Sequence, residues 1–369
     1  MTSIISVRLK FAACGLALMT ALTFVSRPAP AQAVADAEVF FASLESLSAA
    51  QREAKLFEGA KKEGTVVWYT TDGPQPTQQI FRAFAKKYPG VKPEFIRGKS
   101  REIADRITSE ARANRHLFDL AKTSTETYDM YPSDIFASYR SPAKSEIPTS
   151  MQSDKWASVF SFVRAMGYNT KLVKEADLPK SWDDLLDPKW KGKILFDESS
   201  LPEVGALYAR WGKERTAAYV EKLGASGNLQ IRTGRTTLSQ MLSAGEAPIA
   251  VTVYPYDIEN LKAKGAPVDW ALLDLNPGLL QPTSISRRAA HPHAAALLYD
   301  FLLSKEGQEV YAAMGRTPAN PNAAVKNQRE KVAVQDARVV FDEMGVGGAP
   351  LEETMRLLDE KILRRSFQR

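Results

Sequence analysis

The chain has almost no cysteine, since Cys14 is the only one in 369 residues. It lies in an apolar run, residues 11–25, which follows a short basic start and precedes the triplet Ala-Gln-Ala at 31–33. This order is typical of a secretory signal, and the run is shorter than the roughly 20 apolar residues of a membrane span. We predict a cleavable signal peptide over residues 1–33, with an uncleaved membrane anchor as the alternative. The mature chain would then lack cysteine, which excludes disulfides and thiol chemistry.

Histidine is also scarce, with three residues in the whole chain, and common enzyme motifs are absent. There is no G-x-S-x-G, no P-loop, no G-x-G-x-x-G and no H-E-x-x-H. His291 and His293 flank a proline, and we interpret them as a helix start rather than half of a metal site. Asp183 and Asp184 fit a helix start as well, because the helix dipole favours acidic side chains there. We therefore predict that the protein is not an enzyme.

Neither sign of charge is in strong excess, and there is no long basic stripe. The formal net charge of +6 falls to +3 when the three basic residues of segment 1–33 are removed. This balance does not favour a nucleic-acid partner. With 44% hydrophobic and 25% charged residues, the composition is that of a globular protein. The length favours two lobes over one.

What the sequence does contain is an alternation of short β-branched or aromatic runs with longer helical patterns. This alternation predicts an α/β fold. The expected strands cover residues 65–69, 91–96, 118–121, 194–196, 229–232 and 249–253. The expected helices cover residues 46–63, 77–87, 101–112, 204–223, 237–244, 294–301 and 352–362, with a further capped helix start at 181–186. Four large apolar residues recur there at helical spacing and are expected to pack a core: Trp182, Leu185, Leu186 and Trp190.

Polar residues follow several of these strands. In α/β sheets, ligands bind at the carboxyl ends of strands, where loops meet helix N-termini. The sequence therefore predicts one cleft lined by hydroxyls, arginines and two tyrosines. The candidate binding residues are Thr70, Thr71, Asp72, Arg97, Ser100, Ser124, Thr125, Ser199, Ser200, Arg232, Arg235, Tyr254 and Tyr256.

Four segments carry a resemblance to a known family. The central one, residues 178–193, reads LPKSWDDLLDPKWKGK and is preceded by GYNT at 167–170. The other two are LSAGEAPIA at 242–250 and FLLSKEGQE at 301–309. In these segments the chain resembles the extracellular solute-binding proteins of ABC importers, a family that includes ferric-iron-binding proteins. The resemblance covers about residues 50–325.

This resemblance implies a two-lobed periplasmic-binding-protein fold, each lobe a mixed sheet flanked by helices, with the ligand cleft between the lobes. The implied organisation is a signal peptide (1–33), an N-terminal lobe (34–165), a C-terminal lobe (166–268), a return to the N-terminal lobe (269–325) and a C-terminal helical tail (326–369). The protein would be a periplasmic monomer that captures a solute by lobe closure and delivers it to an inner-membrane permease. Two alternatives are a sensor subunit that presents its ligand to a membrane receptor and, more remotely, a secreted enzyme.

The resemblance leaves two readings of the ligand. Iron-binding members use two adjacent tyrosines, with a histidine and a glutamate from the first lobe. In this chain Pro255 separates the tyrosines. An iron site would use Tyr254, Tyr256, Asp72 and Glu126 to hold Fe(III) as transported ligand with a synergistic anion. In the favoured reading there is no cofactor, and hydroxyls together with Arg97, Arg232 and Arg235 bind a small anionic or organic solute, because arginine forks suit carboxylate and phosphate.

Overall fold

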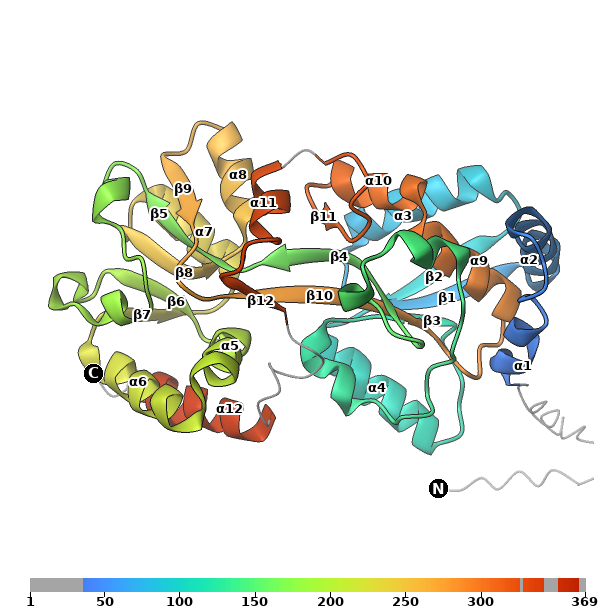
Figure 1. Ribbon diagram of the computed structural model, residues 1–369, viewed down its shortest axis with the longest axis horizontal. Coiled ribbons are helices and arrows are strands. Elements are labelled where there is room, and N and C mark those ends of the chain that lie inside the picture. The colour runs from blue at the N-terminus through green and yellow to red at the C-terminus, as the bar shows by residue number, and fades with distance from the viewer. Residues whose placement is uncertain (1–35, 326–327, 342–350, 365–369) are drawn as a thin grey trace, which may run out of the picture. The chain divides into compact units, whose positions relative to one another are not determined.

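The computed structural model describes residues 36–325, 328–341 and 351–364. The predicted signal peptide, residues 1–33, lies outside these ranges. Within them, no helix is both long and apolar enough to cross a membrane. Two separate β-sheets organise the described chain, and helices flank both (Figure 1).

The first sheet has the strand order β11-β4-β10-β3-β1-β2, with β12 paired to β10. Strands β1 and β2 and strands β1 and β3 pair in parallel, whereas β10 runs antiparallel to both β3 and β4. The sheet is therefore mixed. The strand bounds are β1 Thr65–Thr70, β2 Lys92–Arg97, β3 Leu120–Lys122, β4 Ala157–Val163, β10 Asn276–Ile285, β11 Thr317–Pro318 and β12 Val339–Phe341.

The second sheet has the order β7-β6-β8-β5-β9 and is mixed as well. Strand β6 pairs in parallel with β7 and β8, and β5 runs antiparallel to β8 and β9. The predicted class, α/β with two mixed sheets, is confirmed. The strand bounds are β5 Ala165–Asn169, β6 Ile194–Asp197, β7 Leu229–Arg232, β8 Ile249–Val253 and β9 Val268–Ala271.

Between residues 157 and 285 the chain passes from one sheet to the other twice. It leaves the first sheet at the end of β4 and enters the second at β5, so that Arg164 is the one residue between the two strands. It returns between β9 and β10. The Arg164 amide donates a hydrogen bond of 2.9 Å to the carbonyl of Pro277 on β10, which ties the two crossing segments together.

Helices of the first sheet follow local signals in the sequence. Helix α2 (Ala49–Glu63) begins at a capping box of Ser48 and Gln51 and ends at Gly64, whose φ of 76° is the left-handed conformation that glycine adopts easily. Apolar side chains of these helices pack against the sheet around the buried Trp68. The other helices are α1 Ala37–Ala42, α3 Pro74–Lys87, α4 Ser100–Arg112, α9 Pro292–Leu303 and α10 Lys305–Ala313.

In the second sheet, the single helix predicted over residues 204–223 is wrong. The chain forms α5 (Leu201–Trp211) and α6 (Lys213–Ser226), because Gly212 between them has a φ of 80° and cannot continue a helix. The capped helix start predicted at 181–186 is a 3₁₀ turn, Asp183–Leu186. Its core role is confirmed for Trp182, Leu185 and Trp190, which are buried, whereas Leu186 is partly buried. The remaining helices are α7 Arg235–Ala244 and α8 Pro255–Ala263.

The C-terminal segment, predicted as a helical tail, also contains a strand. Helix α11 (Gln328–Ala333) precedes β12, which pairs in parallel with the start of β10. Helix α12 (Leu351–Leu357) continues as a π-helical turn over Leu358–Leu363 and packs against α5 and α6 (Figure 1). The strand escaped prediction because its three residues form no alternating run of their own.

Candidate functional site

Residues from both sheets line one polar pocket of about 230 Å³. Its walls come from the loops after β1 and β3, from the crossing strands β4 and β10, and from the segment that joins β8 to α8. The lining residues are Thr71, Asp72, Ser100, Lys122, Ser124, Phe160, Phe162, Arg164, Tyr254, Tyr256, Leu279, Gln281 and Arg316.

A buried ion pair forms one wall of this pocket. The Lys122 amine, with its side chain 1% exposed, lies 3.0 Å from Asp72 Oδ1 and 3.1 Å from Gln281 Oε1. Burial lowers the pKa of Lys122, and the Asp72 carboxylate opposes this change. Thr70 holds the other partner in place, because its hydroxyl accepts a hydrogen bond of 3.1 Å from the Asp72 amide. The charges of Lys122 and Asp72 therefore balance each other.

Two stacked tyrosines form another part of the wall. The rings of Tyr254 and Tyr256 lie 5.1 Å apart and within 14° of parallel. The Arg316 guanidinium lies over the Tyr256 ring, 4.4 Å from its centroid, and 5.3 Å from the centroid of Phe160. Burial raises the pKa of Tyr256, and the charge of Arg316 opposes this rise without reversing it. Among the described ion pairs Arg316 forms no salt bridge, although against the effect of burial the charge of Asp72 acts on it and raises its pKa.

The backbone that delivers Tyr254 to the pocket is strained. Thr252, two residues before it on β8, has a φ of 83°, which a β-branched residue adopts only at a cost of about 1–3 kcal/mol. The pairing of β8 with β5 shifts register at this point, as in a β-bulge. Bulges re-aim the side chains that follow them. The strain therefore accompanies the turn that presents both tyrosines to the pocket.

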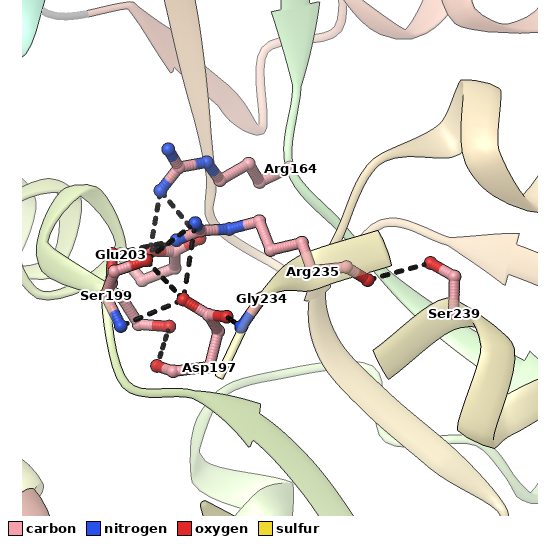
Figure 2. A network of polar contacts seen from close by, with 8 residues as sticks. Arg164, Asp197, Ser199, Glu203, Gly234, Arg235 and Ser239 are labelled. Atoms are coloured by element: carbon pink, nitrogen blue, oxygen red, sulfur yellow. Dashed lines mark hydrogen bonds and ion pairs between the residues drawn. The ribbon is translucent and has the colours of Figure 1, made fainter. Parts of the chain in front are cut away.

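A buried network of charges lies beside Tyr254. Its members are drawn in Figure 2. Glu203, on the first turn of α5, lies 3.2 Å from Arg164 Nη1 and 3.7 Å from Arg235 Nη2. Arg235 also reaches Asp197 Oδ1 at 3.3 Å. Both guanidiniums lie 5.9 Å from the centroid of the Tyr254 ring. The two arginines and two carboxylates leave this network without net charge.

Six of the residues predicted from the sequence line the pocket together: Thr71, Asp72, Ser100, Ser124, Tyr254 and Tyr256. Ser199 and Arg235 instead contact each other in the charge network, where Arg235 donates to the Ser199 hydroxyl at 2.9 Å. Ser200 is buried and donates to the Asp197 carbonyl at 2.7 Å. Thr125 is buried, and the side chain of Glu126 lies outside the described part of the structure.

Arg97 and Arg232 are exposed and do not line the pocket. They end strands β2 and β7, each of which lies at the end of its sheet's strand order. Arg232 donates to the carbonyl of Ile231 at 2.8 Å and to Gln230 Oε1 at 3.1 Å. The edge position alone is not the reason, because Ser100 follows the same strand β2 and lines the pocket. It is the two arginine side chains themselves that are exposed at the strand ends.

Sequence reasoning missed four polar residues of the pocket: Lys122, Arg164, Gln281 and Arg316. Gln281 lies within a strand and Arg164 lies between two strands, so a search restricted to loops does not find them. Lys122 directly follows the strand expected at 118–121, but lysine is not among the side-chain types selected there. A signal exists for Arg164, which is the one charged residue in the apolar run from Val159 to Tyr168. A charge inside a buried run is rare without a partner or a function.

The pocket has too little negative charge to suit a ferric ion. Of its lining residues, Asp72 alone carries a carboxylate, and that carboxylate is already paired with Lys122. Three cationic side chains share the pocket with it. Within the described residues there is no cluster of three or more histidine, cysteine, aspartate or glutamate side chains that could hold a metal. The two tyrosines are the donors that an iron site would use here.

A polar pocket between two mixed sheets, joined by crossing strands, defines the class of solute-binding proteins. The model of the bacterial extracellular solute-binding protein family matches residues 124–337, so the chain belongs to that family. The function of this protein is therefore to bind a solute. The resemblance predicted from the sequence is confirmed.

Three similar proteins illustrate the range of the family. A putative 2-aminoethylphosphonate-binding periplasmic protein of Salmonella typhi is 26% identical over 64% of this chain and 72% of its own length. Iron uptake protein A1 of Synechocystis is 23% identical over 66% of this chain and 71% of its own. The crystal structure of iron-bound HitA from Pseudomonas aeruginosa has a TM-score of 0.69 at 21% identity, covering 80% of this chain and 98% of that one. The last likeness supports the two-lobed fold.

Proposed function

We propose that the pocket binds a small solute that carries a phosphate, phosphonate or carboxylate group, and that the protein delivers it to an inner-membrane ABC permease. The observation that carries the proposal is the Arg316 guanidinium, which lines this pocket and forms no salt bridge with a carboxylate among the described residues. The other charges of the site are balanced by Asp72, Glu203 and Asp197. An anionic group beside Arg316 would complete the balance.

The pocket offers suitable donors around that guanidinium. Hydroxyls of Ser100 and Ser124, which lie 3.3 Å apart, face the same space as the Tyr256 hydroxyl and the Lys122 amine. Hydrogen bonds between charged groups are the strong ones, and an arginine fork matches the geometry of carboxylate and phosphate. The volume, about 230 Å³, is below the roughly 300–1,000 Å³ of sites for drug-sized ligands, so in this conformation the pocket has room for a small solute.

Lobe closure is part of this proposal. Lys122 and Arg316 belong to the segments of the first sheet, whereas Tyr254 and Tyr256 follow a strand of the second. A solute held by both sets favours the conformation in which the two sets are close together. The relative from Salmonella, named for a phosphonate, is consistent with an anionic ligand of this size.

An iron-binding function is the second candidate, because two tyrosines share the pocket and the Synechocystis relative is named for iron uptake. In that case Fe(III) would be the transported ligand, held by Tyr254, Tyr256 and Asp72, with Glu126 as the predicted fourth donor and a synergistic anion to offset the arginine charge. Because the pocket residues carry more positive than negative charge, we favour an anionic solute without iron over a ferric ion. No resident cofactor and no catalysis are proposed in either case.

The test is isothermal titration calorimetry of the purified protein with inorganic phosphate, 2-aminoethylphosphonate, a hexose phosphate, citrate and ferric citrate. We expect a phosphoryl or carboxyl solute to bind without iron. Replacing Arg316 by glutamine should then weaken binding by about 10–100-fold, because a charge-assisted hydrogen bond contributes about 1.5–3 kcal/mol. Arg215→Gln is the matched control, since Arg215 is exposed on α6 and pairs with Asp183 at 3.3 Å.

Two outcomes would contradict the anion proposal. Binding of Fe(III) with a visible charge-transfer band that is lost in Tyr256→Phe would establish the iron function instead. A larger loss in Arg232→Gln than in Arg316→Gln would place the solute at the strand ends selected from the sequence, outside the described pocket.

A periplasmic location, a monomeric state and the absence of a nucleic-acid partner belong to the same proposal. N-terminal sequencing of the protein from a periplasmic extract should begin near residue 34. Recovery of the full-length chain in the membrane fraction would support the anchor instead. Stimulation of a permease's ATPase activity by the loaded protein would distinguish an importer subunit from a sensor subunit.

A further inference from the structure

We propose that Glu203 is a positioning residue for solute recognition, which acts by fixing the Arg164 guanidinium at the wall of the pocket. This inference rests on the proposed function, because it assumes that the pocket binds an anion. It concerns a carboxylate that does not line the pocket and that no sequence motif singles out.

The contacts of Glu203 place it between the two arginines of the network. Its carboxylate, 1% exposed, receives Arg164 Nη1 at 3.4 Å on Oε1 and at 3.2 Å on Oε2. Arg235 approaches the same carboxylate from the second sheet at 3.7 Å. Figure 2 shows both guanidiniums beside Glu203, joined to it by dashed lines. Glu203 is therefore the carboxylate that holds Arg164, whereas Arg235 is also held by Asp197 and Ser199.

The contact between Glu203 and Arg164 matters for the pocket because of where Arg164 lies in the fold. Arg164 is the residue at which the chain passes from β4 to β5, and its side chain lines the pocket. Glu203 belongs to α5, which follows strand β6 of the second sheet. The pair therefore links the crossing point and the pocket to the second sheet. Arginine has many rotamers, and an ion pair that restricts them lowers the entropy cost of ordering the side chain around a solute.

Stability alone does not account for such a pair. A buried ion pair is often no more stabilising than apolar residues of the same volume, because both charges lose their hydration. Here the pair also places a carboxylate near a pocket that we propose to be anion-binding, which is unfavourable unless the carboxylate is useful in orienting Arg164. The alternative use is competition, in which Glu203 occupies Arg164 and the solute must displace it. If Glu203 positions Arg164, removing its charge weakens solute binding, whereas if Glu203 competes with the solute, removing its charge strengthens binding.

Asp197 provides a matched control within the same network. Among the described ion pairs, Asp197 meets only Arg235, at 3.3 Å, whereas Glu203 meets both arginines. Asp197 is also fully buried and accepts a hydrogen bond of 2.6 Å from the Gly234 amide. Glu203→Gln and Asp197→Asn each remove one buried negative charge without a large change of volume. A purely structural effect should therefore be shared by the two variants.

The experiment is a double-variant cycle in which affinities for inorganic phosphate and 2-aminoethylphosphonate are measured by calorimetry. We expect Glu203→Gln to weaken binding by about tenfold, and the same substitution to have no further effect when Arg164 is already glutamine. Glu203→Asp, which keeps the carboxylate, should restore part of the affinity. Asp197→Asn should lower the melting temperature as Glu203→Gln does but change the affinity less.

Three other results would contradict the positioning role of Glu203 or the proposed function on which it rests. Tighter binding in Glu203→Gln would mean that Glu203 competes with the solute. Equal losses in Glu203→Gln and Asp197→Asn, or a loss that persists without Arg164, would mean that the network acts only on the fold. If the unmodified protein binds none of the phosphoryl and carboxyl solutes of the first titration, the proposed anion function fails, and this inference fails with it. If it binds one of them but neither of these two probes, the cycle is measured with the solute that binds.

Discussion

The pair of Lys122 and Asp72 allows a quantitative prediction, because both side chains are buried and their charged atoms lie 3.0 Å apart. At an effective dielectric constant of about 20, two unit charges at this distance attract each other by about 5 kcal/mol. Asp72→Asn removes that attraction but leaves the ammonium group buried. We expect the free energy of unfolding at pH 7 to fall by about 3–5 kcal/mol, the usual cost of breaking a buried pair from one side.

The loss should depend on pH. Burial already lowers the pKa of Lys122, and Asp72 is the main group that opposes this. Without Asp72 the pKa falls further, so the folded state binds fewer protons than the unfolded state, in which lysine titrates near 10.5. Stability then rises with pH up to that value. The deficit of Asp72→Asn should therefore shrink between pH 7 and about pH 10.

Removing both charges is the matched comparison. In the variant Asp72→Asn with Lys122→Met, no charge remains buried at this place, and Gln281 loses one hydrogen bond of 3.1 Å. The loss of this single hydrogen bond costs about 1–2 kcal/mol, so the double variant should recover most of the stability that Asp72→Asn alone loses. Urea unfolding followed by tryptophan fluorescence measures all three proteins. A double variant less stable than Asp72→Asn alone would refute the reasoning, because the two losses would then simply add.

Two further predictions follow from single contacts. Gly224 on α6 faces the carbonyl of Lys361, and a Cβ there would lie 1.8 Å from that oxygen. Gly224→Ala should therefore displace the C-terminal turn and lower the free energy of unfolding by about 1–3 kcal/mol. An unchanged melting temperature would show that this turn is not packed on α6. A hydrogen bond of 2.8 Å to Asp119 raises the pKa of His291 above 6.5. The stabilisation from this bond should be complete below pH 6.5 and lost as the pH rises through the raised pKa, so the stability advantage of the unmodified protein over His291→Gln should decrease from pH 6 to pH 8. A difference in unfolding free energy that stays constant over this range would contradict the prediction.

Local signals predicted the elements that are defined by neighbours in sequence. Strand β1 was evident from its β-branched and aromatic residues, and α2 from its basic end and the glycine that follows. The short strands β11 and β12 were not evident, because each has two or three residues and exists only through pairing with β4 or β10. Gly212 shows the same limit for helices: apolar periodicity continues across it, and only its backbone conformation separates α5 from α6.

The candidate site was predictable where it obeys the rule for parallel strands, as Asp72, Ser124 and the two tyrosines do. That rule also selects Arg97 and Arg232, whose side chains are exposed at the strand ends. It ignores antiparallel strands that run through the middle of a sheet, which is how Gln281 on β10 reaches the pocket. The position of Gln281 depends on strand order, which pairs residues far apart in the sequence.

Charge is the property of this pocket that the sequence conveys least. The sequence offers arginines at strand ends as a positive surface, yet Arg235 is neutralised by Asp197 and Glu203, and Lys122 is neutralised by Asp72. Pairing depends on distances of a few ångströms between residues far apart in the chain. Once these pairs are accounted for, Arg316 remains, a residue that no strand-end rule selects because it lies between α10 and β11. The anion proposal therefore depends on which cation the fold leaves without a salt bridge, and in the described residues of this pocket that cation is Arg316.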